Sequence, residues 1–408
     1  MGLAAGIKTI RNFSLTRLLI GGNNMFKLLK NGHVYSPENL GVKDILLWED
    51  RVIKIGEGLK IPEGFEGAEF DLSGKIIIPG IVDTHVHITG GGGEGGFTTR
   101  TSEITFEEIA EAGVTTLVGV LGTDGYARRV EDVLVKCMAL REEGFDCYFL
   151  TGSYTFPITT MRGSVAEDII FNEYCLGTGE VAHCDHRGSL MRYEEFTRLA
   201  ADTRNGARLA GLKGVLNIHL GNYPDPADFF IKACEEDITF RPLIVPTHVT
   251  RKYDVFDSCL KFLEYGGQID ITAGSDGDAS QKSYGSVEGL EIIYKKYGTL
   301  DRVTMTSDGN GSAPIWDELG NMIGMGKGSS KVLLADLKKA TKNGIIPFEE
   351  TLRTMTTIPA AVYGLKNSAG KIVENGTANF AVLDENLDLV ETILNGNLVW
   401  LKGKGVVR

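Results

Sequence analysis

Strand-like alternation of apolar and polar positions occupies both ends of the chain. Residues 26–78 read as short strands separated by turns, and residues 379–408 return to the same pattern. The dipeptides placed where hairpins would turn are Asn31-Gly32, Glu49-Asp50 and Asn395-Gly396. Because these strands flank one long central region, we expect them to pair into a single small β-sandwich domain built from both termini.

The pattern changes after Gly80. Apolar strand-like runs alternate with helix-like stretches as far as Asp308, which is typical of β/α units around a parallel sheet. About eight strand candidates favour a closed barrel over an open sheet. We therefore expect an α/β fold, with a (β/α)8 TIM-like barrel at residues 80–362 and β-sandwich segments at residues 25–79 and 363–408.

The first 24 residues lack acids and carry Lys8, Arg11 and Arg17, a composition also found in targeting leaders. No long apolar run or small-residue cleavage site follows. We interpret residues 1–24 as an N-terminal extension before a fold that begins near Met25, with a working signal as the alternative.

Composition restricts the partners of the chain. Its 408 residues are enough for a barrel of about 250 residues and an appendage. The net charge of −12 argues against a nucleic-acid partner, which requires clustered basic residues. No run approaches the roughly 18 apolar residues of a membrane span. The 6 scattered cysteines show no C-x-x-C spacing, so we expect a reducing, cytoplasmic location.

Four histidines close apolar strand-like runs. His85 and His87 form a His-x-His pair, and side chains two positions apart on a strand share a face, so both imidazoles can reach one ion. His219 and His248 end later runs in a chain with only 7 histidines. Histidines can simply be satisfied by hydrogen bonds, but four at strand ends predict a metal site at the carboxyl end of a barrel.

Two further segments have motifs with a structural and a functional interpretation. Asp308 lies in Ser-Asp-Gly, which alone would indicate a turn, but it follows a strand as the histidines do and can both bind a metal and accept a proton. Gly91, Gly93 and Gly96 formally match G-x-G-x-x-G, yet no helix or later acid completes a dinucleotide site. We expect a loop that carries Glu94 over the site, with a structural turn as the alternative.

The ordered set His-x-His, single His, single His and Asp resembles the amidohydrolase superfamily. Within it, several segments are similar to β-aspartyl (isoaspartyl) dipeptidases, and the similarity runs from about residue 27 to the C-terminus. These segments are His87-Ile-Thr-Gly-Gly-Gly-Gly-Glu94, Leu150-Thr-Gly-Ser-Tyr154, Asp185-His186-Arg187, Pro246-Thr-His248-Val-Thr-Arg251 and Ser307-Asp-Gly-Asn-Gly-Ser312.

The resemblance implies two divalent metal ions. Members of this group commonly bridge their ions with a carboxylated lysine at the place where this chain has Glu180, whose two oxygens can bridge as a lysine carbamate does. Zinc is the expected metal, and manganese or cobalt are the alternatives. The implied ligands are His85, His87, Glu180, His219, His248 and Asp308.

The implied reaction is hydrolysis of the isopeptide bond of a β-aspartyl dipeptide by a metal-bridging hydroxide, with Asp308 as the proton shuttle. Tyr154 would donate a hydrogen bond to the developing oxyanion. Glu94 would pair with the substrate ammonium, and the remaining substrate contacts would come from Thr123, Arg187, Arg251 and Ser312. We expect a small dipeptide substrate and a homo-oligomer.

Two other functions stay open. Another amidohydrolase, such as a dihydroorotase, hydantoinase or N-acyl-amino-acid hydrolase, would share the metal centre and differ in its pocket. A non-catalytic scaffold protein on the same fold would have lost its metal ligands, whereas this chain keeps the histidines and the aspartate and has a competent acid at position 180.

Overall fold

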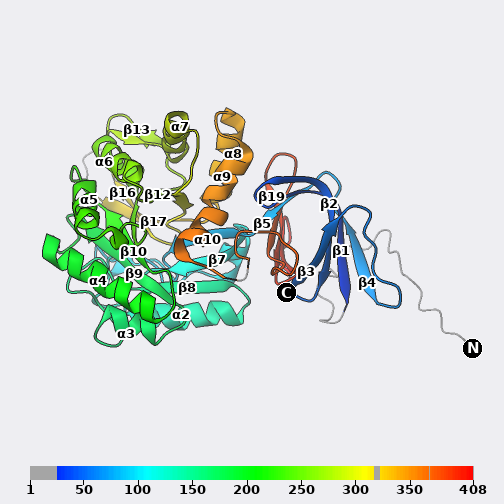
Figure 1. Ribbon diagram of the computed structural model, residues 1–408, viewed down its shortest axis with the longest axis horizontal. Helices are drawn as coiled ribbons and strands as arrows, with labels where there is room; N and C mark the ends of the chain where they lie inside the picture. The colour runs from blue at the N-terminus through cyan, green and yellow to red at the C-terminus, as the bar shows by residue number, and fades with distance from the viewer. Residues whose placement is uncertain (1–24, 317–321, 367, 408) are drawn as a thin grey trace, which may run out of the picture.

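A computed structural model describes residues 25–316, 322–366 and 368–407. Figure 1 shows two parts side by side: a larger α/β part and a smaller part made of strands. The expected N-terminal extension, residues 1–24, lies outside the described residues. No helix in the described ranges is long and apolar enough to cross a membrane.

Eight parallel strands follow one another around the larger part. β6 to β11 form one ladder in chain order, β12 pairs with β15, and a bridge between Val86 and Gly309 brings the last strand beside the first. Their cores are buried on both faces, as expected when helices cover a parallel sheet. The strands are β6 (Ile81–Val86), β7 (Val114–Gly119), β8 (Asp146–Thr151), β9 (Cys175–His183), β10 (Val215–Leu220), β11 (Ile244–Thr247), β12 (Ile269–Thr272) and β15 (Val303–Thr306).

Helices connect these strands and cover the outside of the sheet (Figure 1). In α4, the buried positions Phe196, Leu199, Ala200 and Thr203 recur at helical spacing, so one face packs inward. The α-helices are α1 (Phe106–Ala110), α2 (Val130–Glu142), α3 (Val165–Ile170), α4 (Tyr193–Leu209), α5 (Ala227–Glu236), α6 (Tyr253–Glu264), α7 (Ser286–Tyr297), α8 (Val332–Asn343), α9 (Phe348–Thr354) and α10 (Thr357–Tyr363). Short 3-10 helices occur at η2 (Phe97–Thr99), η3 (Ile238–Phe240) and η4 (Val249–Arg251).

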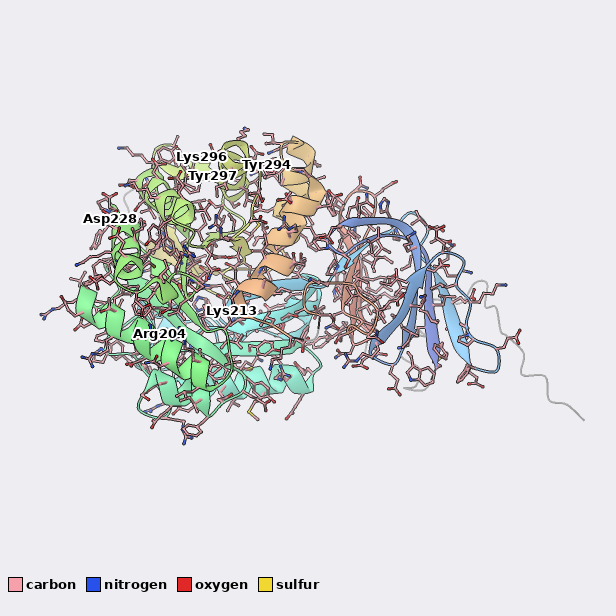
Figure 2. The ribbon with its side chains drawn as sticks, viewed as in Figure 1. Arg204, Lys213, Asp228, Tyr294, Lys296 and Tyr297 are labelled. Atoms are coloured by element: carbon pink, nitrogen blue, oxygen red, sulfur yellow. The ribbon has the colours of Figure 1, made fainter. Side chains whose placement is uncertain are left out.

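Polar contacts join the outer helices to their neighbours, and Figure 2 labels several of the side chains involved. Lys296 Nζ and Tyr297 Oη of α7 both lie 2.8 Å from Glu264 Oε1 at the end of α6. Arg204 of α4 pairs with Asp237. These contacts lie on the outer surface and hold the helix layer together laterally.

The smaller part is one nine-stranded sheet in which strands from both ends of the chain meet. Antiparallel pairing of β18 with β5 joins the C-terminal strands to the N-terminal ones, in the order β21-β20-β19-β18-β5-β1-β2-β3, with β4 on β1. These strands are β1 (Phe26–Tyr35), β2 (Asn39–Trp48), β3 (Arg51–Gly56), β4 (Gly67–Asp71), β5 (Ile76–Pro79), β18 (Phe380–Leu383), β19 (Leu389–Leu394), β20 (Asn397–Leu401) and β21 (Gly405–Val406).

The α/β class with a curled parallel sheet is confirmed. The description of the terminal strands as a β-sandwich, and the division at residues 25–79, 80–362 and 363–408, remain proposals. A separate apolar cluster inside the terminal sheet, which includes Leu47, Ile77, Phe380 and Ile393, supports that division because it draws on both ends of the chain.

The hairpin predictions had mixed outcomes. Glu49-Asp50 turns β2 into β3, and Asn395-Gly396 turns β19 into β20. The prediction at Asn31-Gly32 was wrong, because both residues lie inside β1, where the register with β2 shifts. Asn31 adopts a φ of 61°, and its N–H donates to Asp44 Oδ1 at 2.9 Å. The pair therefore forms a bulge rather than a turn.

Two short hairpins were not foreseen. The antiparallel pairs are β13 (Gly277–Asp278) with β14 (Ser283–Tyr284), and β16 (Ser312–Trp316) with β17 (Met322–Lys327). The second pair begins four residues after Asp308 and so extends from the carboxyl end of the barrel strands.

Candidate metal centre

The six predicted ligands meet at the carboxyl end of the barrel. His85, Glu180 and His219 lie within β6, β9 and β10. His87 and His248 directly follow β6 and β11, and Asp308 lies two residues after β15. Both His248 and Asp308 adopt positive φ angles, 64° and 50°, so the chain turns sharply where each strand ends. All six are buried except Asp308, whose side chain is 28% exposed.

Glu180 lies between two pairs of histidines. Its Oε1 atom is 2.5 Å from Nδ1 of His219 and 3.1 Å from Nε2 of His248. Its Oε2 atom is 3.4 Å from Nε2 of His85 and 3.6 Å from Nε2 of His87. Each carboxylate oxygen therefore faces a separate pair of imidazoles, the arrangement that a bridging ligand between two cations requires.

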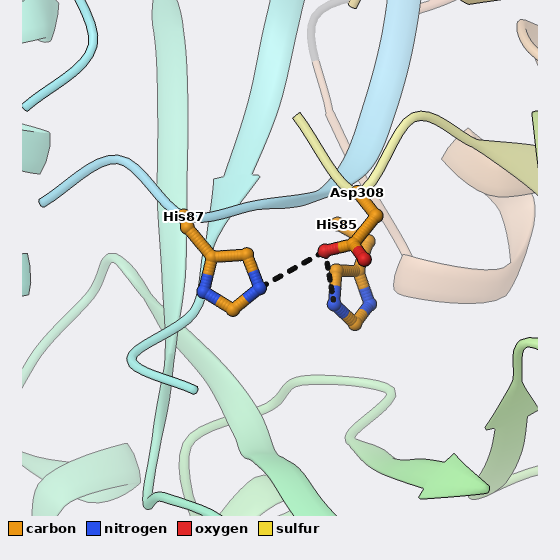
Figure 3. Close-up of side chains that lie close together, drawn as sticks. All are labelled: His85, His87 and Asp308. Carbon is orange, nitrogen blue, oxygen red and sulfur yellow. Dashed lines mark ion pairs between the residues drawn. The ribbon is translucent and has the colours of Figure 1, made fainter. Parts of the chain in front are cut away.

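Asp308 completes one side of this arrangement. Its Oδ1 atom lies 3.0 Å from Nε2 of His87 and 3.7 Å from Nε2 of His85 (Figure 3). We call His85, His87 and Asp308 the first ligand cluster, and Glu180 Oε1 with His219 and His248 the second ligand cluster.

The donor atoms fit metal ions by proximity and by chemistry. In two groups, His85 with His87 and Asp308, and His85 with Glu180 and His248, the possible ligand atoms lie within 4.8 Å of one another. Several of these buried atoms have no hydrogen-bond partner among the described residues: both ring nitrogens of His85, Oε2 of Glu180 and Oδ1 of Asp308. Buried polar atoms are rarely left unpaired, so a cation is the partner that suits them.

The electrostatics favour ionised carboxylates at the centre. Burial would raise the pKa of Glu180, but nearby His85 and His219 and hydrogen bonds from the histidines hold that pKa well below its usual range. Burial opposes charge on His85 as well, yet Glu180 and Asp308 raise the pKa of His85 to about 9. Burial, followed by repulsion from His219, lowers the pKa of His248 to about 3. Negative charge is thus concentrated where cations would bind.

A second layer of contacts orients the histidine rings. Nδ1 of His248 lies 2.6 Å from the hydroxyl of Thr272, which leaves Nε2 directed at Glu180. Nε2 of His219 lies 3.1 Å from Asp185 Oδ2, which leaves Nδ1 directed at Glu180. Such contacts fix the ring orientation and the tautomer of metal-binding histidines.

Both predicted substrate-binding arginines lie beside His219. Arg187 bonds both oxygens of Asp185, from Nε at 3.0 Å and from Nη2 at 2.9 Å. Arg251 Nη1 donates to the carbonyl of Leu220 at 2.6 Å and lies 3.0 Å from His219 Nε2. Hydrogen bonds from His219 and Arg187 outweigh burial and hold the pKa of Asp185 far below its usual range. The arginines therefore form a compact positive group next to the ligand clusters.

Tyr154 also contacts the centre. Its Oη atom is 2.7 Å from Nδ1 of His219 and 3.4 Å from Oε1 of Glu180. Burial and the negative charge of Glu180 raise the pKa of Tyr154 well above its usual value. The phenol therefore keeps its proton and can donate a hydrogen bond.

The remaining predicted contacts lie in loops after the strands. Ser312 donates to Glu94 Oε1 at 2.7 Å, and the same oxygen lies 3.8 Å from Arg187 Nη1. Glu94, in the segment that carries the glycine run, thus lies between Ser312 and Arg187. Thr123 is half-buried in the loop after β7, and within the described ranges its side chain makes no hydrogen bond to another predicted site residue.

Sequence reasoning gave no role to Asp185 or Thr272. Asp185 was part of the Asp-His-Arg segment, and its position two residues before Arg187 was the signal that a carboxylate would accompany the arginine. Thr272 ends β12, and its contact with His248 depends on the neighbouring strand, which no local pattern reveals. His186, between Asp185 and Arg187, has a side chain that is 77% exposed.

Comparison with known proteins agrees with this geometry. A β-aspartyl dipeptidase from Fervidobacterium islandicum AW-1, solved with the dipeptide β-Asp-Leu, is 36% identical, with a TM-score of 0.87, over 94% of this chain and 98% of that one. A dihydropyrimidinase from Brevibacillus agri NCHU1002 shares the fold at 15% identity, with a TM-score of 0.66, over 94% of this chain and 96% of that one. No family model matches the sequence.

Curated sequence relatives carry a different name. A dihydroorotase from Listeria monocytogenes is 35% identical over 97 residues, which are 24% of this chain and 21% of that protein. The chain thus matches only about a fifth of the length of the first such relatives. A dihydroorotase from Ligilactobacillus salivarius is 22% identical across 90% of this chain and 91% of its own length.

Fold, strand-end ligands and full-length similarity together define the class: the chain belongs to the amidohydrolase superfamily. Within that superfamily it resembles the β-aspartyl dipeptidases, with which it shares more than a third of its residues over nearly its whole length.

Proposed function

We propose that this chain hydrolyses the isopeptide bond of β-aspartyl dipeptides at a centre of two divalent metal ions. The observation that carries the proposal is Glu180, whose two oxygens each face a different pair of histidines. The full-length similarity to a β-aspartyl dipeptidase supports the choice of substrate.

The ions would be held by the two ligand clusters, with Glu180 shared between them. When bound, they would supply Lewis acidity, which makes water a nucleophile near neutral pH and polarises the scissile carbonyl. Imidazole and carboxylate donors suit zinc, which we propose as the resident metal.

Asp308 is placed to move the proton. Its carboxylate is at the edge of the first ligand cluster and is partly exposed, so it can contact both a nucleophilic water and the leaving amine. Burial would raise the pKa of Asp308, but contacts with His87 and the other histidines hold it well below its usual value. The side chain is therefore ionised and ready to accept a proton at Oδ2 or Oδ1. Tyr154 would donate a hydrogen bond to the carbonyl oxygen as negative charge develops on it.

Charge complementarity accounts for the side chains outside the ligand clusters. A β-aspartyl dipeptide presents one free ammonium and two carboxylates. Arg187 and Arg251 would bind carboxylates, with Ser312 and Thr123 adding hydroxyl contacts. Glu94, 3.8 Å from Arg187, would bind the ammonium. We also propose a homo-oligomer. Measurement of the native mass of the protein in solution, compared with the mass of one chain, would test this proposal.

A second candidate is hydrolysis of a cyclic amide, as in dihydroorotases and hydantoinases. The curated sequence matches favour it. Two arginines with one acid beside them favour a zwitterionic dipeptide, because a cyclic imide offers fewer charges for them to neutralise. A non-catalytic scaffold role is the weaker alternative, since the buried ligand atoms remain in place.

A substrate panel tests the proposal. We expect turnover of β-Asp-Leu by the zinc-loaded protein, little turnover of α-Asp-Leu or dihydroorotate, and loss of activity on addition of a chelator. Substrates would be compared by kcat/KM under identical metal loading. Preference for dihydroorotate would replace the dipeptidase proposal by the cyclic-amide one, and no turnover of any amide by metal-loaded protein would support a scaffold.

A further inference from the structure

The backbone ladder of the barrel is interrupted at two places. Among the described strands, no backbone pairing joins β11 to β12, and β15 meets β6 through the single bridge between Val86 and Gly309. We call these places the β11/β12 seam and the β15/β6 seam. A fully buried carboxylate lies at each seam: Asp270 is 1% exposed and Asp83 is 0% exposed.

Asp83 of β6 spans the β15/β6 seam. Its Oδ1 atom accepts the backbone N–H of Ser307 at 3.1 Å, and its Oδ2 atom accepts the hydroxyls of Ser307 and, at 3.0 Å, of Ser330. The backbone N–H of His85 also faces this carboxylate. Because Ser307 directly precedes Asp308, one carboxylate anchors the backbone beside two members of the first ligand cluster.

Asp270 of β12 spans the β11/β12 seam. Its Oδ2 atom accepts the hydroxyl of Thr247, the last residue of β11, at 2.6 Å, and that of Thr306 at 2.7 Å. Its Oδ1 atom accepts the hydroxyl of Thr304 at 2.5 Å. Thr247 directly precedes His248, a member of the second ligand cluster.

The same strand contacts His248 a second time. Thr272 lies two residues after Asp270, so both side chains point to the same side of β12, and the Thr272 hydroxyl lies 2.6 Å from Nδ1 of His248. Asp270 thus binds the residue before His248 and lies on the same strand as Thr272, which contacts the His248 ring.

The arrangement is selective. The ligands of β9 and β10 lie on strands that a backbone ladder constrains on both sides, although the β9–β10 register shifts beside Glu180. The ligands beside a seam lack that constraint on one side, and buried hydrogen bonds to a carboxylate supply it.

We propose that Asp83 and Asp270 are positioning residues for the metal centre, Asp83 for the first ligand cluster and Asp270 for the second. This inference rests on the metal centre of the proposed function but not on the identity of the substrate. It assigns each buried carboxylate to one of the two ions.

Site-selective metal loss tests the inference. We expect wild-type protein to hold two zinc ions per chain by elemental analysis. Asp83→Ala and Asp270→Ala should each lower the affinity for one of the two ions by about 10- to 100-fold, so that about one ion remains after dialysis against a weak chelator. With cobalt in place of zinc, the two variants should lose different parts of the visible absorption spectrum, because the ligands disturbed are different.

Milder variants guard against loss of folding. Asp83→Asn and Asp270→Asn keep the shape of the side chain, and the neighbouring hydroxyls can turn to accept from the amide, so we expect these variants to retain more metal than the alanine variants. Thr247→Val removes a single donor to Asp270 and should weaken only the second ion.

Asp168→Ala is the matched control. Asp168 is also fully buried and accepts three hydrogen bonds, from the Thr151 hydroxyl at 2.5 Å and from the backbone N–H groups of Met161 and Arg162 at 3.0 and 2.9 Å. It contacts no candidate ligand. We expect this variant to lose stability while it keeps two ions and the wild-type cobalt spectrum.

The outcomes separate this inference from the proposed function. Retention of two ions and an unchanged spectrum in the folded Asp83 and Asp270 variants would overturn it, as would equal metal loss in Asp168→Ala. Wild-type protein that binds two ions but cleaves no β-aspartyl dipeptide would remove the proposed substrate and leave the positioning roles intact. Wild-type protein that binds no metal would overturn both.

Discussion

Among single residues, Glu180 is the side chain on which the proposed two-metal centre depends. An unmodified glutamate side chain occupies the place where similar dipeptidases commonly carry a carboxylated lysine. It sits between four imidazoles at distances from 2.5 to 3.6 Å. A buried glutamate whose two oxygens point at different histidine pairs can bind one cation with each oxygen, without any modification of the chain.

Substitution of Arg251 would test the proposed recognition of the substrate. Arg251→Ala should lower kcat/KM for β-Asp-Leu by about 30-fold or more, because loss of one partner of a desolvated charge pair costs about 2–5 kcal/mol. Steady-state kinetics and thermal unfolding of the same preparation would measure it. Arg208→Ala, which removes an exposed arginine of α4, serves as the control. An unchanged kcat/KM in the Arg251 variant would remove this residue from the substrate site.

His183 makes stability depend on pH. Burial against Phe229 and Phe230 lowers the pKa of His183 to about 4, below the value of about 6.5 expected in the unfolded chain. The unfolded state therefore binds the extra proton between these values, and the free energy of unfolding should fall as pH drops from 6.5 toward 4. The loss attributable to this group is about 3 kcal/mol and is absent above pH of about 7.

Urea unfolding of wild type and His183→Gln across this pH range would measure the effect. The difference in unfolding free energy between the two proteins should change with pH in the window from 4 to 6.5 and stay constant above it. A difference that is constant throughout would show that His183 titrates alike in the folded and unfolded states.

At the scale of elements, the strand ends position the chemistry and the strand interiors set how closely the barrel packs. Gly177 in β9 shows this. A Cβ atom there would lie 2.0 Å from the carbonyl oxygen and 2.7 Å from the nitrogen of Val215 in β10. Both obstacles are backbone atoms, so the two strands would have to separate. Glu180 lies three residues further along β9, and His219 lies on β10.

Gly177→Ala should therefore damage both packing and site. We expect a loss of about 1–3 kcal/mol or more in unfolding free energy and weaker metal retention, since the strands that carry Glu180 and His219 move apart. Gly56→Ala in β3 is the control, because a Cβ there meets only Leu59 at an ordinary distance of 3.4 Å. Equal stability of the two variants, by thermal unfolding, would contradict the packing argument.

At the scale of the whole molecule, the barrel brings together residues that are distant in the chain and keeps their charges out of water. Several buried ligand atoms have no hydrogen-bond partner among the described residues. The free-energy cost of removing these atoms from water is therefore not fully offset until cations bind to them. Metal binding and folding stability should consequently be linked.

Metal removal should lower stability as well as activity. A chelator should abolish turnover and reduce the unfolding free energy by about 4 kcal/mol relative to protein with metal at a thousand times its dissociation constant. Calorimetry with and without chelator would measure the shift, and added zinc should restore both properties. His85→Ala should show a much smaller chelator effect. A wild-type melting curve insensitive to chelator would contradict the linkage.

Local patterns along the chain are enough to predict the alternation of β/α units and the residue types at the strand ends. A barrel strand places its last residues at one common edge, whatever its neighbours are. This rule was enough to predict five candidate metal ligands: His85, His87, His219, His248 and Asp308. Glu180 and the arginines needed the resemblance to known dipeptidases, since acids and arginines are too common for their positions alone to identify a site. The bulge at Asn31 went unrecognised because its turn-like dipeptide is held inside a strand by Asp44.

The pairing of those residues with one another depends on the folded barrel. Glu180 divides its oxygens between two histidine pairs that come from three different strands, β6, β10 and β11, and Asp83 bonds Ser307 across 224 positions of the chain. Such contacts depend on where the barrel closes and on which ladders are interrupted. Local sequence patterns report the direction in which a side chain points along its own strand, whereas closure is a property of all the strands packed together.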